Sequence, residues 1–200
     1  MRRARGFGLI EVLITLLVFS IGVLAVAGLQ AISKKNNYDA LQRNTAANLA
    51  DAIIASMRAN PDALSAYLVP ADAPLGSRDN TSAPEVNCYD TACSPAELAA
   101  FDLWQWELAL DGATELAGTD GNEETGGLAS PSACIDGPAG GGAGIYRVIL
   151  VWRGVTRLES GAGEDCGSGR GLYAAPDDTA GAASDERYQR SLVVTTYIAP

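Results

Sequence analysis

The chain opens with a long apolar segment that contains one acidic residue. Between Phe7 and Ile32 almost every side chain is apolar, and Glu11 lies inside this run. About 20 consecutive apolar residues suffice for a helix to cross the hydrocarbon core of a bilayer. A carboxylate at the membrane centre costs about 2.5–3.5 kcal/mol on an insertion scale. The pattern therefore predicts a membrane-spanning helix whose acid has a specific role.

The helical pattern continues beyond this segment. Apolar or small residues recur every three or four positions, at Tyr38, Leu41, Thr45, Leu49, Ile53 and Met57. No proline interrupts the pattern before Pro61, which predicts one helix from near Phe7 to about Ala59. Such a helix is about 80 Å long. Residues 7–32 would form its lipid-compatible half, and residues 33–59 an amphipathic half that needs a covering layer.

A second, shorter helix is expected near residues 95–110. Ser94 is a favourable N-cap, Pro95 occupies the first helical position, and Glu97 stands three residues after the cap. Between the two helices, residues 62–68 are expected to form a brief helical turn and residues 70–86 a loop. The side chains expected to face inward from the second helix are Leu98, Phe101, Leu108 and one or both of Trp104 and Trp106.

Three strands are expected in the last third of the chain. Residues 145–153 alternate strongly, residues 192–199 form a second strong strand, and residues 133–136 a weak one. The Gly-rich residues 137–144 would join the first two strands along the chain as a hairpin. The expected fold class is α+β: a long N-terminal helix packed on a small antiparallel sheet, with the short helix in addition.

Composition and charge exclude several classes of function. The chain has 14 Lys and Arg against 24 Asp and Glu, a net charge of −10, which argues against nucleic acid as a partner. Histidine is absent, so hydrolytic triads and His-ligated metal sites are excluded. We expect a protein that is not an enzyme, with no catalytic residue, cofactor or metal.

Two local sequences have some features of binding sites. Residues 119–125, TDGNEET, gather oxygen ligands beside a glycine but lack the spacing of a calcium-binding EF-hand loop. Residues 167–171, GSGRG, are Gly-rich but lack the Lys-Ser/Thr of a phosphate-binding loop. We expect a surface turn in the first case and a loop in the second.

The four cysteines all follow the apolar segment, where a chain that crosses the membrane reaches an oxidising space. An even count without C-x-x-C spacing favours two disulfides. We expect Cys88–Cys93 to close a small local loop. Cys134–Cys166 would tether the long connection between Gly154 and Arg190, although four cysteines permit three pairings.

The N-terminus also fits a removable secretory signal, with Arg2, Arg3 and Arg5 as its basic region. Three features weigh against that reading: the acid within the apolar run, the junction of Gly6 and Phe7, and a helical pattern that continues without a break.

The same residues carry a resemblance to a known family. RGFGLIEVLITLLVFSIG, residues 5–22, resembles the class III signal and stem of type IV pilins and pseudopilins, with a short basic leader and an acid five residues into the mature chain. With CSPAELAAFDLWQWELAL at 93–110 and YRVILVW at 146–152, the chain is similar to PilV-type minor pilins. A minor pseudopilin of a type II secretion system and a signal-anchored periplasmic binding module are the alternatives.

The resemblance implies how the chain is processed and with what it assembles. Residues 1–6 would be the leader, cut by prepilin peptidase after Gly6, and Phe7 would be the new, N-methylated terminus. Glu11 would pair with the terminal amine of a neighbouring stem. Residues 60–200 would form a periplasmic head on a single-pass inner-membrane protein with a cytoplasmic N-terminus. The assembled pilus, and its tip in particular, would be its destination.

The partners implied are other minor pilins, the major pilin and an adhesin-like tip protein. The resemblance thus implies roles in starting pilus assembly, twitching motility and cell adhesion. Many major pilins carry a proline midway along the stem, where the helix can loosen on assembly. This chain has Gly22 and Gly28 there, and glycine weakens a helix interior by about 0.5–1 kcal/mol relative to alanine. The contact surface expected for partners is the acidic connection from Gly154 to Arg190.

Overall fold

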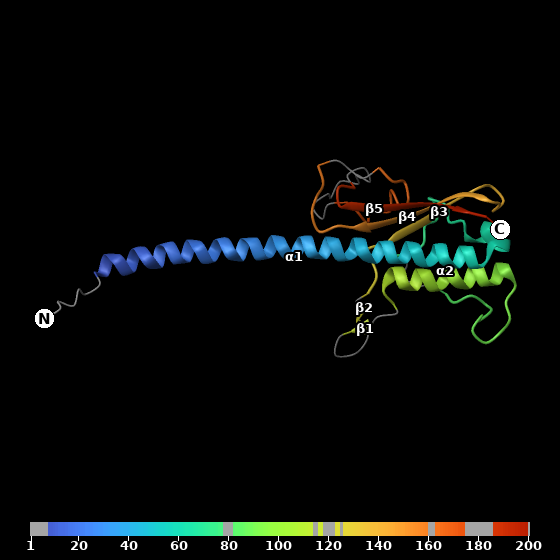
Figure 1. The fold of residues 1–200 in the computed structure, drawn as a ribbon, viewed down its shortest axis with the longest axis horizontal. Coiled ribbons are helices and arrows are strands. Elements are labelled where there is room, and N and C mark those ends of the chain that lie inside the picture. The colour runs from blue at the N-terminus through green and yellow to red at the C-terminus, as the bar shows by residue number, and fades with distance from the viewer. Residues whose placement is uncertain are drawn as a thin grey trace. The chain divides into compact units, whose positions relative to one another are not determined.

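The computed structural model describes residues 8–77, 82–113, 116–117, 123–124, 126–159, 163–174 and 186–199 (Figure 1). The chain divides into two compact units, Met1–Asp39 and Ala40–Pro200. Helix α1 (Leu9–Ala59) begins in the first unit and ends in the second. The helix stops at Ala59 because Pro61 has no N–H to donate to the preceding turn. One long helix was expected from the sequence, and one is present.

The second unit adds two further helical elements and two small sheets. They are η1 (Pro61–Tyr67), α2 (Pro95–Asp111), β1 (Leu116–Ala117), β2 (Glu123–Glu124), β3 (Ser132–Asp136), β4 (Gly144–Arg153) and β5 (Gln189–Ile198). Strands β1 and β2 form a short antiparallel pair that was not expected from the sequence. Strand β5 begins three residues earlier than expected.

Three strands form the main sheet, in the order β3-β4-β5, and both pairings are antiparallel. The outer edge of β3 is partly closed by two isolated bridges, Val69 with Ile135 and Leu75 with Ala133. Side chains of Tyr146, Val148 and Leu150 point to the face that packs on the helices, where they are fully buried. The expected α+β arrangement, a long helix on a three-stranded antiparallel sheet with an extra helix, is confirmed.

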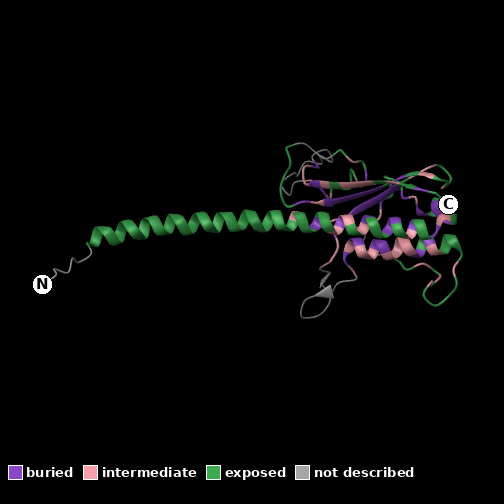
Figure 2. Ribbon diagram, in the orientation of Figure 1, coloured by how far each residue is buried: buried purple, intermediate pink, exposed green. Residues whose placement is uncertain are grey.

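The buried face of α1 differs from the expected one around Tyr38 and Leu41. The buried residues are Gln42, Ala46, Ala50, Ile53, Ile54 and Met57. Tyr38 and Leu41, expected on this face, are 40% and 60% exposed. The buried face thus begins one turn later than expected and includes the small residues Ala46 and Ala50. Figure 2 shows burial beginning only in the second half of α1.

Helix α2 covers another side of α1. Its capping box is complete: the Ser94 hydroxyl accepts from the Glu97 N–H, and the Glu97 carboxylate accepts from the Ser94 N–H. The core side of the helix carries Ala99, Leu103, Trp106 and Leu110. The Trp106 indole N–H donates to the Leu49 carbonyl of α1 at 2.9 Å, which fixes the two helices together.

The prediction of which α2 side chains face inward was partly wrong. Leu98 and Leu108 are only half-buried. Phe101 is buried, but against Tyr89 and Trp104 rather than in the main core, with ring centroids 5.1 and 5.5 Å away. The helix therefore has two apolar sides, one on α1 and one under the short loop that carries Tyr89. A helix covered on two sides does not show a single apolar stripe in its sequence.

Candidate functional site: the apolar stem and the tethered head loop

The first candidate site is the stem segment, residues 9–32 of α1. All of its side chains are exposed in the single chain, including Leu9 at 87%, Phe19 at 69% and Leu24 at 75%. An 18-residue window reaches a mean hydropathy of 2.7, so the segment is long and apolar enough to cross a membrane. At 1.5 Å per residue it covers about 36 Å, slightly more than a hydrocarbon core. Such a surface requires lipid or other helices around it.

Glu11 lies in the first turn of this segment. Its backbone N–H and that of Val12 donate to the Gly8 carbonyl at 3.0 and 3.4 Å, which starts the helix. Within the described part of the chain, no cation lies at ion-pair distance from the Glu11 carboxylate. The positive end of the helix dipole favours an acid in the first turn. Gly6 and Phe7, the expected cleavage and methylation positions, lie outside the described residues.

The two hydroxyl groups of the stem segment bond within the helix. The Thr15 hydroxyl donates to the Val12 carbonyl at 2.9 Å, and the Ser20 hydroxyl to the Leu17 carbonyl at 2.8 Å. These bonds make both residues compatible with hydrocarbon. Helix α1 runs without a break through Gly22 and Gly28, and a shallow groove over Gly22 is lined by Phe19 and Val26. Glu11 is the one ionisable side chain of the stem segment, and its compensation must come from elsewhere or from the helix end.

The second candidate site lies in the second unit, where a loop covers the outer face of the sheet. A disulfide joins Cys134 of β3 to Cys166, and a second joins Cys88 to Cys93. These are the two pairings expected from the sequence. Around the first disulfide, Ile149, Val151 and Tyr173 form a smaller apolar cluster on the face opposite the main core. The centre of the sheet is therefore covered on both faces.

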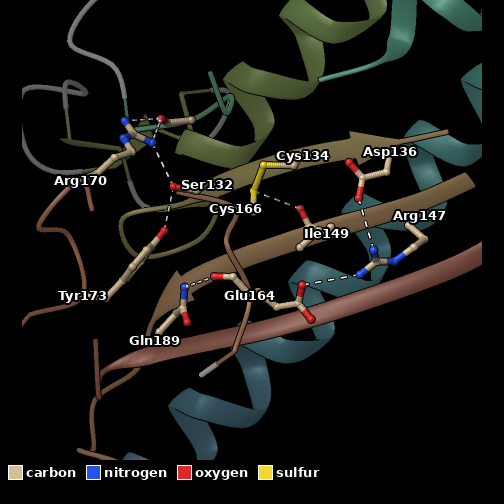
Figure 3. Close-up of a disulfide and its surroundings, with 11 residues drawn as sticks. Ser132, Cys134, Asp136, Arg147, Ile149, Glu164, Cys166, Arg170, Tyr173 and Gln189 are labelled. Carbon is tan, nitrogen blue, oxygen red and sulfur yellow. Dashed lines mark hydrogen bonds and ion pairs between the residues drawn. A yellow bond between two sulfur atoms is a disulfide. The ribbon is translucent and has the colours of Figure 1, made fainter. Parts of the chain in front are cut away.

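Arg170 and Tyr173 hold this loop in place (Figure 3). The Arg170 guanidinium donates to the carbonyls of Gly76 and Ser77 and to the Ser132 hydroxyl, at 3.0–3.1 Å. The Tyr173 hydroxyl also donates to the Ser132 hydroxyl, at 2.8 Å. Burial raises the pKa of Tyr173 to about 12, although its bond to Ser132 opposes the shift. The loop is therefore pinned by polar contacts as well as by the disulfide.

Gly167 has a steric reason to be glycine. Its φ is +72°, and a Cβ at this position would lie 2.3 Å from the Ser132 hydroxyl oxygen. The GSGRG stretch, residues 167–171, thus forms a turn against the sheet, as expected, and its arginine binds the protein's own carbonyls. Residues 119–122 and 125 of the acidic stretch lie outside the described residues. Among those that are described, no group of three or more acidic, His or Cys side chains has the arrangement of a metal site.

The roles of Gln42 and Arg170 were not predicted from the sequence. Gln42 is buried on α1, donates to the Gly127 carbonyl at 3.2 Å and accepts from the Ala129 N–H at 2.8 Å. It thereby connects the helix to the segment that leads into β3. A signal was present for Gln42, since it is an uncharged polar residue one position from the expected apolar stripe. Nothing in the local sequence indicates the carbonyl partners of Arg170, which are more than 90 positions away.

Two family models match the chain. The model described as Type IV pilin Tt1218 matches residues 28–104, and the prokaryotic N-terminal methylation motif matches residues 1–27. No curated protein and no solved structure gives a significant match. The methylation motif implies processing by prepilin peptidase, passage through the membrane and assembly with other pilins into a pilus. The family is structural and not enzymatic.

The two matches adjoin and include all of α1, the first helical turns after it and the start of α2. The fold of the chain, an apolar N-terminal helix with a three-stranded antiparallel sheet, is a pilin-like α+β fold. The chain is therefore similar to type IV pilins over residues 28–104 and carries the prokaryotic N-terminal methylation motif over residues 1–27.

Proposed function

We propose that this chain is a PilV-type minor pilin, which joins other minor pilins at the inner membrane to start pilus assembly and remains at the pilus tip. The observation that carries the proposal is the fully exposed apolar stem segment with Glu11 in its first turn. An uncovered apolar helix of this length is a structural element for packing among other such helices in a membrane or a fibre.

Processing prepares the stem for assembly. The basic leader, residues 1–6, is cut after Gly6 by prepilin peptidase, and Phe7 becomes an N-methylated terminus. The amine of Phe7 is a cation near neutral pH, because an α-amine has a pKa of about 7.7–8.0. Residues 7–32 then lie in the membrane, residues 33–59 form the amphipathic half of the helix, and residues 60–200 form the periplasmic head.

Glu11 selects the axial position of the stem. A charge left unpaired in hydrocarbon costs about 2.5–3.5 kcal/mol on an insertion scale. A neighbouring stem at the correct axial offset places its Phe7 amine beside the Glu11 carboxylate, and both charges are then compensated. Stems at other offsets leave both charges in lipid. The pair therefore acts mainly on register, since the net affinity gained from a buried ion pair is small.

A Glu11→Ala variant tests this role. We expect cleavage after Gly6 to remain close to that of the parent chain, while co-purification with partner pilins from membranes falls at least tenfold. Leu13→Ala, a change of similar size in the same exposed stretch, is the matched control and should leave co-purification nearly unchanged. Normal co-assembly of Glu11→Ala would remove the basis of the register mechanism.

The main alternative is a minor pseudopilin of a type II secretion system, which would share the stem chemistry. The mid-chain helix α2, with its complete capping box, favours the minor pilin, because PilV-type sequences resemble this chain there as well as in the stem. Deleting the gene separates the two functions. Loss of twitching motility and of adhesion with normal exoprotein secretion supports the minor pilin, and the reverse result supports the pseudopilin.

The third possibility, a signal-anchored binding module, predicts a different N-terminus. In cells without prepilin peptidase the proposed function requires a chain that still begins with its leader, whereas the parent strain yields a methylated Phe7. An N-terminus that is the same in both strains would exclude the pilin pathway. The tip position is tested by co-purification with the major pilin and an adhesin-like tip protein, and by immunogold labelling of sheared pili.

A further inference from the structure

The outer edge of β5 carries backbone groups that have no backbone partner in the described part of the chain. The Gly154 N–H donates to the Tyr188 carbonyl at 2.7 Å, and this fixes the phase of the β4–β5 ladder. Hydrogen-bonded pairs alternate along an antiparallel ladder, so the even-numbered residues of β5 bond to β4. The N–H and C=O groups that point away from the sheet belong to Ser191, Val193, Thr195 and Tyr197.

This edge lacks the features that normally protect a free edge. Ten consecutive residue pairs join β4 to β5 without a bulge. From Ser191 to Ile198 the strand contains no charge and no proline, and five of its eight residues are β-branched valine, threonine or isoleucine. Natural edge strands are usually short, bulged, charged or covered, because an open edge is a template for another strand. The far edge of β3 is partly closed in this way by Val69 and Leu75, whereas no described segment forms such bridges with β5.

An exposed apolar pair lies beside the open edge. Ile145 and Tyr197 face each other across β4 and β5, and they are 63% and 64% exposed. They lie on the outer face of the sheet, beyond the part that the tethered loop covers. An added strand that places an apolar side chain next to Tyr197 would cover this pair.

The direction of β5 argues against a second copy of the chain as the added strand. Arg58, near the end of α1, donates to the Thr196 hydroxyl near the end of β5, so helix and strand run the same way (Figure 1). A two-fold dimer through β5 pairs the strands antiparallel and thus sets the two Ala40–Ala59 segments antiparallel. Chains that enter this segment from one membrane must share an orientation.

We propose that the free edge of β5 binds an extended segment of a partner pilus subunit as a fourth strand. The segment has an uncharged centre, which pairs with Ser191, Val193, Thr195 and Tyr197, and it is flanked by basic residues. The charge follows from the second unit, residues 40–200, where 22 Asp and Glu stand against 9 Arg, a net charge of −13. Main-chain hydrogen bonds would supply affinity, and pockets for alternate side chains specificity.

The proposal rests on the pilin function above and is tested in cells that produce the full chain. The photoreactive residue p-benzoylphenylalanine replaces Tyr197, and the crosslinked peptide is identified by mass spectrometry. We expect an adduct with an uncharged, extended segment of another protein. Thr195→Pro removes one outward N–H and should lower its yield at least tenfold, whereas Thr195→Val, which keeps the N–H, should not.

The same photoreactive residue at Tyr89 is the positional control, since Tyr89 is exposed but lies away from β5. Its adducts should not respond to Thr195→Pro. No adduct from position 197, an adduct of two copies of this chain, or a yield insensitive to Thr195→Pro would each overturn the proposal.

Hydrogen exchange supplies a measurement that needs no variant. In the purified full chain in detergent, the N–H groups of Val193 and Thr195 should exchange at least tenfold faster than those of Leu192 and Val194. Slow exchange at all four would mean that the edge is already covered, and would refute the inference. Leader cleavage and the dependence of assembly on Glu11, measured in the same cells, show separately whether the pilin function itself fails.

Discussion

Removing the disulfide between Cys134 and Cys166 should destabilise the head far more than removing the one between Cys88 and Cys93. The first joins β3 to the loop over the outer face of the sheet, and both of its cysteines are buried. The second closes a local loop before α2, and its cysteines are half-buried. Two double variants are compared. One carries Cys134→Ala and Cys166→Ala, and the other carries Cys88→Ala and Cys93→Ala.

The magnitude follows from the sizes of the closed loops. The sequence separations are 32 and 5 residues. Loop-closure entropy lost by the unfolded chain corresponds to about 4 kcal/mol for the longer loop and about 2 kcal/mol for the shorter. The buried pair also leaves a small void beside Ile149 and Tyr173, which adds about 1 kcal/mol. At about 2–4 °C per kcal/mol, the first variant should melt at least 10 °C below the parent chain and the second about 5 °C below it.

The measurement is thermal unfolding of the full chain in detergent, followed by near-ultraviolet circular dichroism. This signal reports the aromatic side chains and so follows the second unit, which contains all three tryptophans. Equal losses in the two variants, or a larger loss on removing Cys88–Cys93, would refute the loop-size argument. The parent chain treated with a reductant should lose about the sum of the two.

Two further predictions concern buried polar groups. Gln42→Ala should lower the free energy of unfolding by about 2 kcal/mol, because it leaves the Gly127 carbonyl and the Ala129 N–H without this partner. The control Arg43→Ala, at an exposed neighbouring position, should change the free energy of unfolding by no more than about 0.5 kcal/mol. Equal effects of the two variants in denaturant titrations would contradict the assigned contacts. Burial raises the pKa of Tyr67, Tyr146 and Tyr173, the last to about 12, and a hydrogen bond to Asp102 adds to the shift at Tyr67. The stability gained by keeping these hydroxyls neutral is complete below the unfolded pKa of about 10 and is lost as pH rises through the folded pKa values. Tyrosinate absorbance should therefore show three tyrosines that ionise late or only on unfolding. Ionisation of all seven tyrosines together near pH 10 would contradict the burial.

The elements that could be predicted were those whose signals are local. Helix α2 begins where its capping box places it, at Ser94 and Glu97, because those contacts lie within four residues. Helix α1 ends just before Pro61 for a reason that also lies in the sequence. Both disulfides followed from the need to tether a long connection and from one short spacing.

The parts that could not be predicted depend on residues far apart in the chain. The buried side of α1 starts at Gln42 rather than at Tyr38 because the partners of Gln42 are the carbonyl of Gly127 and the N–H of Ala129, over 80 positions away. The outer face of β4 is partly buried because the loop carrying Cys166 and Tyr173 folds over it. The helix of the stem segment could be predicted from the sequence, because its apolar composition indicates a helix without contacts from other parts of the chain.

The shared direction of α1 and β5 has a mechanical consequence. Arg58 meets Thr196 at one end of this arrangement, and Gln42 meets the segment before β3 at the other. A tensile load applied along Ala40–Ala59 therefore acts parallel to the strands. It shears the contacts between helix and sheet all at once rather than peeling them apart one after another. We expect this unit to resist pulling along its helix better than pulling across it.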